Sequence, residues 1–198
     1  MKVQRMLLLP GLALAACLPA QADSPNLIDN GHFEQLKGGL PVGWTAPQDS
    51  EIIKTAFPVE EGRGVSAQVE LLRSGDKGAY FGKSVKVEPN TRYRLSLLAR
   101  MSKGKITVAV GGGTGDNKLN IRVLGEPSTR MPMAPLFWEA PWYKNLIFKA
   151  NEWQPVTIEF DSGDLTQVAV SFGAYFTAGQ YSFDDVSLTK IGPATNGQ

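Results

Sequence analysis

The stretch NLIDNGHFEQLKGGLPVGW, from Asn26 to Trp44, decides how the rest of the chain can fold. Leu27–Ile28 is a short apolar run that predicts a first strand. The triplet Asp29–Gly31 follows it and consists of residues that turn the chain sharply because they tolerate positive φ. Phe33 is then expected to enter the core beside this turn, while Glu34 points at whatever the turn encloses.

The remainder of the chain has the pattern of an antiparallel all-β protein. Short segments rich in β-branched or aromatic residues are separated by Gly, Pro, Asn and Asp, and no long segment has the 3.6-residue apolar period of a helix. This spacing predicts a two-sheet β-sandwich of the jelly-roll type. The expected strands are 51–55, 66–71, 80–87, 92–101, 105–110, 154–160, 168–172 and 181–188.

Both ends of this pattern carry a family resemblance. The chain opens with Asn-Leu-Ile-Asp-Asn-Gly-His-Phe-Glu at 26–34, has Gly-Trp at 43–44, and closes with Phe-Asp-Asp-Val-Ser-Leu at 183–188. These motifs resemble the galactose-binding-like jelly rolls of carbohydrate-binding modules, of the type appended to bacterial xylanases and cellulases. Between the opening and closing motifs, the chain resembles the family only in the spacing of its strand-like segments, most clearly at 93–100. The resemblance implies the fold and says much less about the ligand, because such folds host many functions.

The resemblance also implies a structural calcium ion. In the family, an acidic residue of the opening motif and an aspartate of the closing strand hold the ion, which here implies Glu34 with Asp184 or Asp185. Calcium prefers roughly six to eight oxygen ligands, and such a site would join the first strand to the last. If Val186 faces the core, strand parity makes Asp184 the inward ligand. His32 stands where the family often has Asp or Gly, and solvated acidic residues without a metal are the alternative.

The densest aromatic and proline stretch is MPMAPLFWEAPWYKNLIFK, from Met131 to Lys149. Its prolines argue against a regular helix or a central strand, so its rings are expected on an ordered loop. Flat rings can stack on sugars as a binding platform, or they can plug the end of the sandwich. Trp44 and Trp153 are instead expected to be core anchors. The residues expected to bind a glycan are Phe137, Trp138, Glu139, Trp142, Tyr143 and Lys144.

A catalytic constellation cannot be assembled from these residues. His32 is the single histidine, and it lies in the turn to which the family resemblance assigns a structural role. Cys17 is the single cysteine and lies in the expected signal segment, so we do not expect a Ser-His-Asp, Cys-His or zinc-type grouping. The glycine run 111–115 lacks the ending of a phosphate loop, so a hairpin is expected there. A carboxylate pair for glycoside hydrolysis, such as Glu139 with Asp116 or Glu126, is the remaining enzyme hypothesis. We therefore expect a protein that is not an enzyme.

Residues 1–22 have the three-part layout of a secretory signal peptide. Lys2 and Arg5 precede an apolar run at 6–16, and Ala-Gln-Ala at 20–22 forms a cleavage site. The apolar run is too short to span a bilayer stably. This layout predicts export to the periplasm, the outer membrane or the extracellular space.

A second processing route competes with the first. The segment Leu14–Cys17 resembles a bacterial lipobox, in which the cysteine is lipidated and becomes the mature N-terminus. In either case the folded part has no disulfide, so it depends on its core and on any bound metal. The expected organisation is the signal peptide, a β-sandwich domain at 23–192 and a short tail at 193–198.

Charge narrows the range of partners. The chain has 20 Lys and Arg residues against 19 Asp and Glu residues, with no clustered basic face to bind nucleic acid or an anionic membrane. The only membrane contact we expect is a lipid on Cys17. The sequence therefore predicts an exported protein that binds an oligo- or polysaccharide. The alternatives are an envelope module that binds another protein on the same fold and, third, a polysaccharide hydrolase or lyase.

The variant Cys17→Ser distinguishes the two processing routes. If the lipobox is used, this change releases the protein from membranes or blocks its maturation, because the lipid has no other attachment point. Fractionation of cells followed by mass spectrometry of the mature N-terminus measures the outcome. Unchanged soluble export would instead favour cleavage after Ala22.

Overall fold

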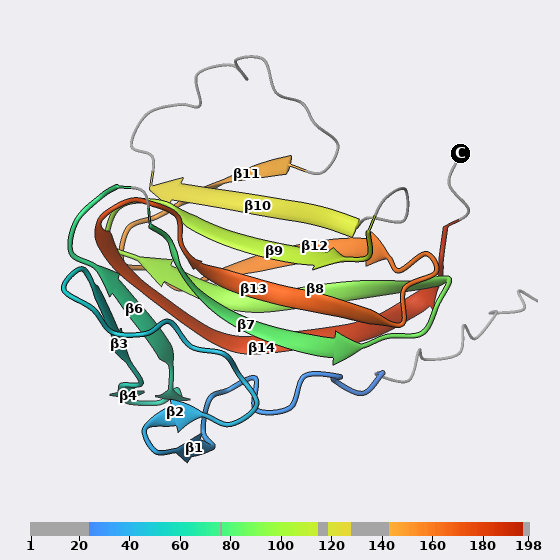
Figure 1. Cartoon of the computed structure of the whole chain (residues 1–198), viewed down its shortest axis with the longest axis horizontal. Coiled ribbons are helices and arrows are strands. Elements are labelled where there is room, and N and C mark those ends of the chain that lie inside the picture. The colour runs from blue at the N-terminus through green and yellow to red at the C-terminus, as the bar shows by residue number, and fades with distance from the viewer. Residues whose placement is uncertain (1–23, 76, 115–118, 128–142, 196–198) are drawn as a thin grey trace, which may run out of the picture.

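The computed structural model describes residues 24–75, 77–114, 119–127 and 143–195 of the 198-residue chain, with the backbone alone at 127 and 143–145. All regular structure in these residues is β-strand, so they include no helix long and apolar enough to cross a membrane. Two five-stranded sheets pack face to face as a jelly-roll β-sandwich (Figure 1). The predicted fold class is confirmed.

The strands follow the predicted pattern closely. In spatial order the first sheet contains β11 (Tyr143–Phe148), β10 (Leu119–Pro127), β9 (Ile106–Gly112), β13 (Gln167–Ala174) and β7 (Ala79–Lys86). The second contains β12 (Gln154–Asp161), β8 (Thr91–Met101), β14 (Gly179–Pro193), β6 (Ala67–Leu71) and β3 (Ile53–Ala56). Two small hairpins stand outside these sheets, formed by β1 (Leu36–Lys37) with β2 (Leu40–Pro41) and by β4 (Val59–Glu60) with β5 (Gly64–Val65). All eight expected strands are present.

Two strands of the first sheet, β10 and β11, were not predicted. β9 and β10 pair antiparallel across the glycine run, which confirms the expected hairpin. β11 then pairs with β10 in parallel, with Tyr143 opposite Arg122, and is the one parallel pairing among the described strands. The prolines of the aromatic stretch all precede β11, so they do not interrupt its ladder. The expectation that Tyr143 and Lys144 lie on a loop is therefore wrong for their backbone.

The space between the sheets is filled by alternating apolar side chains. On β8, the odd-numbered residues from Thr91 to Met101 are buried while the even-numbered ones face outward. Phe33 is fully buried and Trp44 is 9% exposed, as predicted. Both rings pack against Phe172, with ring centroids 6.3 and 5.3 Å away. The opening stretch thus contributes its large side chains to the same core as the sheets.

The expected first strand at Leu27–Ile28 does not form. Leu27 N donates to Leu188 O at 2.9 Å, but the next bonds are made by a side chain. The Asn26 Oδ1 atom accepts from Ile28 N at 3.0 Å and from Leu188 N at 2.9 Å. A side-chain amide thus takes the place of the strand carbonyl, and the chain turns away from β14 after one backbone contact.

The turn after it packs tightly against β14. Asn30 has a φ of 55°, as expected for a turn residue, and its backbone carbonyl accepts from the Trp44 indole at 3.0 Å. Gly31 O accepts from Val186 N at 3.0 Å. A Cβ atom at Gly31 would lie 2.0 Å from Val186 O, so only glycine fits there.

We predict that Gly31→Ala destabilises the domain by about 1–3 kcal/mol, because the added methyl group must push the turn away from β14. Urea denaturation measures the loss. Gly75→Ala is the matched control, since a Cβ atom at Gly75 meets no heavy atom within 4 Å. Equal stability of the two variants would contradict the close approach of Gly31 to Val186 of β14.

Candidate functional site

The outer face of the first sheet has a floor of small residues. Cross-strand pairing places one row of side chains on this face, formed by Tyr80, Gly173, Thr107 and Leu124. The next row is formed by Gly82, Ser171, Ala109 and Arg122. The third row is Ser84, Ala169, Gly111 and Asn120. Thr107, Gly173 and Leu124 of the first row are buried, whereas Ala169 and Asn120 of the third row are exposed. A flat ligand can therefore approach the sheet over the third row, whose central positions carry little or no side chain.

Aromatic and cationic side chains stand at one end of this floor. The guanidinium carbon of Arg122 lies 5.8 Å from the centroid of the Tyr175 ring. Phe176 is 38% exposed and packs edge-on against Tyr175 with centroids 4.8 Å apart. Tyr80 lies in the row next to that of Arg122, and burial raises the pKa of the Tyr80 hydroxyl while the charge of Arg122 opposes that shift. We call Tyr80, Arg122 and Tyr175 the tyrosine–arginine group.

One hydroxyl on this face lacks a partner. Thr107 is 3% exposed, and its Oγ1 atom forms no hydrogen bond within the part of the chain that the structure describes. Thr107 lies two strands from Tyr80 in the same row. Buried hydroxyls are normally hydrogen-bonded, so this unpaired hydroxyl is an exception, and its burial closes it to solvent.

The aromatic stretch enters this sheet at its edge. Phe137, Trp138, Glu139 and Trp142 lie outside the described residues, so the choice between platform and plug stays open. Tyr143 and Lys144 begin β11, where only their backbone is described. The position of Tyr143 opposite Arg122 puts the end of the stretch in the same row as Arg122.

The predicted metal ligands lie on the opposite side of the sandwich, at a β-bulge in β14. Asp184 pairs with Leu98 and Ser187 pairs with Ser96. An advance of three residues on β14 therefore lies opposite an advance of two residues on β8. Asp185 takes up the extra residue with a φ of 53°. The parity argument is therefore wrong, because Asp184 lies on the outer face although it is only 1% exposed.

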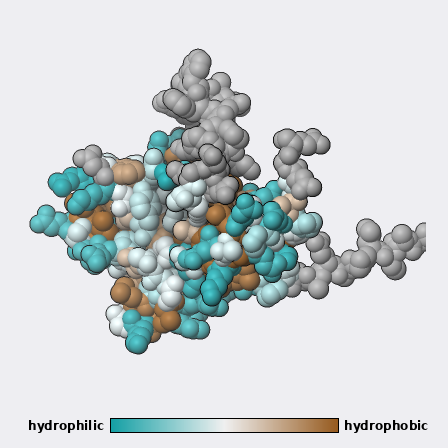
Figure 2. Space-filling view, turned by 45° about the vertical axis from the view of Figure 1, so that its right-hand side comes forward, coloured by the Kyte–Doolittle hydropathy of each residue, from teal (hydrophilic) through white to brown (hydrophobic). Residues whose placement is uncertain are grey.

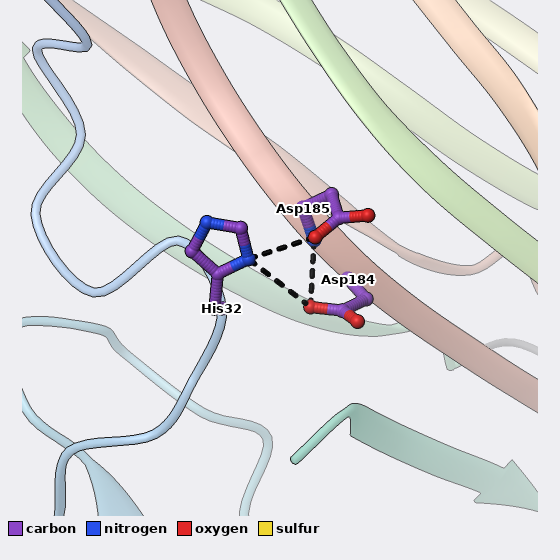
Figure 3. Close-up of side chains that lie close together, drawn as sticks. All are labelled: His32, Asp184 and Asp185. Carbon is purple, nitrogen blue, oxygen red and sulfur yellow. Dashed lines mark hydrogen bonds and ion pairs between the residues drawn. The ribbon is translucent and has the colours of Figure 1, made fainter. Parts of the chain in front are cut away.

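His32, Asp184 and Asp185 converge at this bulge (Figure 3). The His32 Nδ1 atom lies 2.7 Å from Asp185 Oδ1 and 4.0 Å from Asp184 Oδ1. Arg63, which the sequence analysis missed, donates through Nη1 to Asp185 Oδ2 at 3.1 Å and to Asp184 Oδ2 at 3.4 Å. Burial raises the pKa of Asp184, and hydrogen bonds from Asp185 N and Arg63 oppose that shift. We call these four residues the acid–arginine cluster.

Glu34 does not join the cluster. Its Oε1 atom accepts from Val65 N at 2.9 Å, so it holds the β4–β5 hairpin instead. Both oxygens of each aspartate already face a backbone amide, the imidazole or the guanidinium. Calcium prefers roughly six to eight oxygens and no imidazole nitrogen. The donor set that gathers here does not fit the calcium ion implied by the family resemblance.

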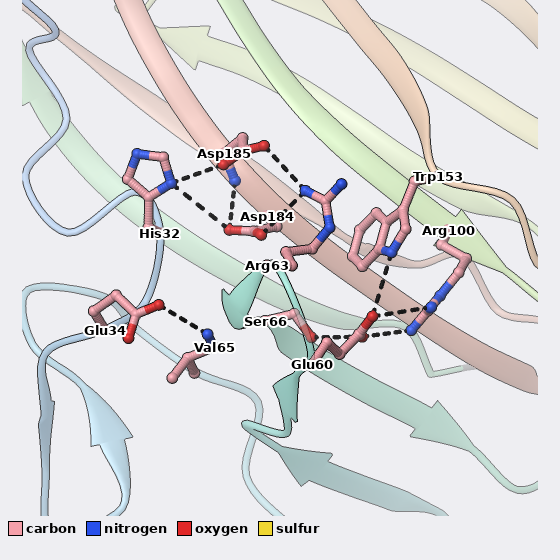
Figure 4. A network of polar contacts seen from close by, with 10 residues as sticks. All are labelled: His32, Glu34, Glu60, Arg63, Val65, Ser66, Arg100, Trp153, Asp184 and Asp185. Atoms are coloured by element: carbon pink, nitrogen blue, oxygen red, sulfur yellow. Dashed lines mark hydrogen bonds and ion pairs between the residues drawn. The ribbon is translucent and has the colours of Figure 1, made fainter.

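The cluster continues across the outer face of the second sheet (Figure 4). The Trp153 ring lies between two guanidinium groups, with its centroid 4.7 Å from Arg63 and 4.6 Å from Arg100. Arg100 in turn makes two hydrogen bonds to Glu60, at 2.6 and 3.1 Å. Trp153 is therefore a partly exposed bridge, and the prediction that it anchors the core is wrong.

Two of the missed residues carry a sequence signal that could have placed them on the surface. Arg100 and Tyr80 occupy outward positions in predicted strands, so alternation along each strand could have placed them on the surface. Which outward residues meet depends on the order of strands in the sheets, and sequence spacing does not give that order.

No family model and no curated protein matches this chain. Solved structures match it in fold. A family 4 carbohydrate-binding module has a TM-score of 0.54 at 19% identity, over 83% of this chain and 99% of the module. A family 61 module in complex with β-1,4-galactotriose has a TM-score of 0.52 at 17% identity, over 85% and 100%.

A larger protein also contains a similar domain. The enzymatically active domain of tailspike protein 4 from bacteriophage CBA120 has a TM-score of 0.56 at 13% identity, over 84% of this chain but only 21% of that domain. These likenesses show that the chain has the jelly-roll fold of carbohydrate-binding modules.

We predict that Trp153→Ala lowers the free energy of unfolding by about 1–2 kcal/mol, because it removes two cation–π contacts worth about 0.5–1 kcal/mol each. Trp44→Ala, which opens the core, is expected to lose about 3–5 kcal/mol. Chemical denaturation of both variants makes the comparison. A loss for Trp153→Ala as large as that for Trp44→Ala would contradict its position on the outer face.

Proposed function

We propose that this chain is an exported, non-catalytic protein that binds an oligo- or polysaccharide on the outer face of its first sheet. The tyrosine–arginine group carries the proposal, because it combines aromatic rings with a cationic donor at the end of a floor of small residues. A sugar ring can stack on a tyrosine face while its hydroxyls accept hydrogen bonds from Arg122.

The floor supplies the remaining polar contacts. Ser171 and Asn120 lie on the same face as Arg122, and their side chains can donate to a sugar oxygen or accept from a sugar hydroxyl. In this proposal the aromatic stretch extends the platform from the β11 edge, with Phe137, Trp138, Glu139, Trp142, Tyr143 and Lys144 as further contacts. The saccharide would then lie across the strands of the first sheet.

Hydrolysis is less well supported than binding. Glycosidases need two carboxyl groups about 5–9.5 Å apart on either side of a sugar. Asp184 and Asp185 are adjacent in one bulge, and Arg63 binds both of them. Asp116 and Glu139 lie outside the described residues. The match to the tailspike domain covers 21% of that domain, so it gives no support for the same activity in this chain.

One observation favours a second candidate, a module that binds another envelope protein. Leu36, Leu40 and Val42 are 41%, 53% and 43% exposed around the β1–β2 hairpin. In the view of Figure 2, however, the apolar surface is broken up by polar side chains. Large protein interfaces bury continuous patches, so we rank this function below glycan binding.

We predict that Tyr80→Ala and Tyr175→Ala each weaken binding to a recognised glycan by roughly fivefold or more, because each removes a stacking surface. A glycan array identifies the ligand, and calorimetry then measures the affinity of each variant. Arg94→Ala is the control, since Arg94 is exposed on the opposite sheet. Thermal melting confirms that each variant is folded.

Two results would contradict the proposal. Unchanged glycan affinity in both tyrosine variants would contradict glycan binding on the outer face of the first sheet. If the array gives no hit while an envelope protein co-purifies with the chain, the second candidate is favoured instead.

A further inference from the structure

The acid–arginine cluster joins three segments that are far apart in the sequence. His32 comes from the opening turn, Arg63 from the β4–β5 hairpin, and Asp184 and Asp185 from the bulge in β14 (Figure 4). This junction is where the family resemblance implies a metal ion. The residues that fill it, however, already include a cation.

Two neighbouring carboxylates create the need for positive charge. Asp184 is 1% exposed and Asp185 39% exposed, and their charges repel each other. Burial also disfavours the ionised form of Asp184. A cation in contact with both groups offsets these effects, and either a metal ion or a guanidinium can provide it.

The fold holds Arg63 in the required place from several sides. Gly62 and Gly64, with φ of 74° and 94°, let the hairpin turn tightly around it. Glu34 binds the backbone amide of Val65 just after this turn. On its other side, the Arg63 guanidinium lies 4.7 Å from the centroid of the Trp153 ring.

We propose that Arg63 replaces the structural metal ion, so that the opening turn, the β4–β5 hairpin and β14 are joined without calcium. Its Nη1 atom lies within 3.1–3.4 Å of an oxygen from each aspartate and bridges them as a metal would. The cation is thus part of the chain, and it cannot be removed by a chelator.

The first test compares the melting temperature of the wild-type protein in EDTA and in excess calcium. We expect no difference. If calcium bound the wild-type protein, a calcium concentration about 100-fold above the Kd would raise the melting temperature of a domain of this size by roughly 5–10 °C. A shift of that size in the wild-type protein would overturn the proposal.

The second test removes the internal cation. We expect Arg63→Met to melt at a lower temperature than the wild type, and calcium to raise the melting temperature of this variant because the Oδ2 atoms of both aspartates lose their cation. Arg94→Met is the matched control. Arg94 lies on the outer face of the same sheet as the cluster, but its Nη2 atom donates to Glu159 Oε1 at 2.7 Å and not to the cluster. The control should not respond to calcium.

Arg63→Lys keeps the test decisive if Arg63→Met fails to fold. Lysine retains the charge, so this variant should fold and melt at the same temperature in EDTA and in calcium. A calcium-dependent melting temperature for Arg63→Lys would contradict the proposal, as would an Arg63→Met variant that melts like the Arg94→Met control or ignores calcium. Glycan affinity of the wild type in EDTA tests the binding proposal separately.

Discussion

The bulge in β14 is the constraint on which the rest of the structure depends. One additional residue between Asp184 and Ser187 keeps Asp185 beside Asp184, which already faces outward, and leaves Val186 to receive the opening turn. Phe183 before the bulge and Leu188 after it still face the core, so the strand keeps its place between β6 and β8. Without the bulge, the closing strand could not bind the opening stretch and fill the core together.

The two outer faces of the sandwich differ in what they leave free. On the second sheet, Arg63, Arg100 and Trp153 are tied to carboxylates and to one another, which stabilises that side and leaves few polar groups for a ligand. On the first sheet, the tyrosine–arginine group lies beside positions that carry small side chains. This contrast is the physical reason for placing the saccharide on the first sheet.

Most of the fold could be predicted because it depends on alternation, which a sequence displays directly. The failures occur where a single residue breaks that rule. Asn26 replaces a strand carbonyl with its side chain, and the bulge reverses the parity on which the placement of Asp184 relied. Glu34 was predicted as a metal ligand but binds the β4–β5 hairpin, because the position of that hairpin is set by tertiary contacts. Which surface residues meet follows from strand order, and spacing along the chain does not reveal that order.

The contact between the opening stretch and β14 also bears on how the chain folds. Asn26 bonds to Leu188 across 162 positions, and the same side chain reaches Val186 across 160. Contacts of such long range form slowly, because much of the chain must be ordered before they repay the entropy of closing so large a loop. A chain growing on the ribosome cannot complete its fold until almost its last strand has been made. During this delay, the opening stretch lacks the strand that it binds in the finished fold.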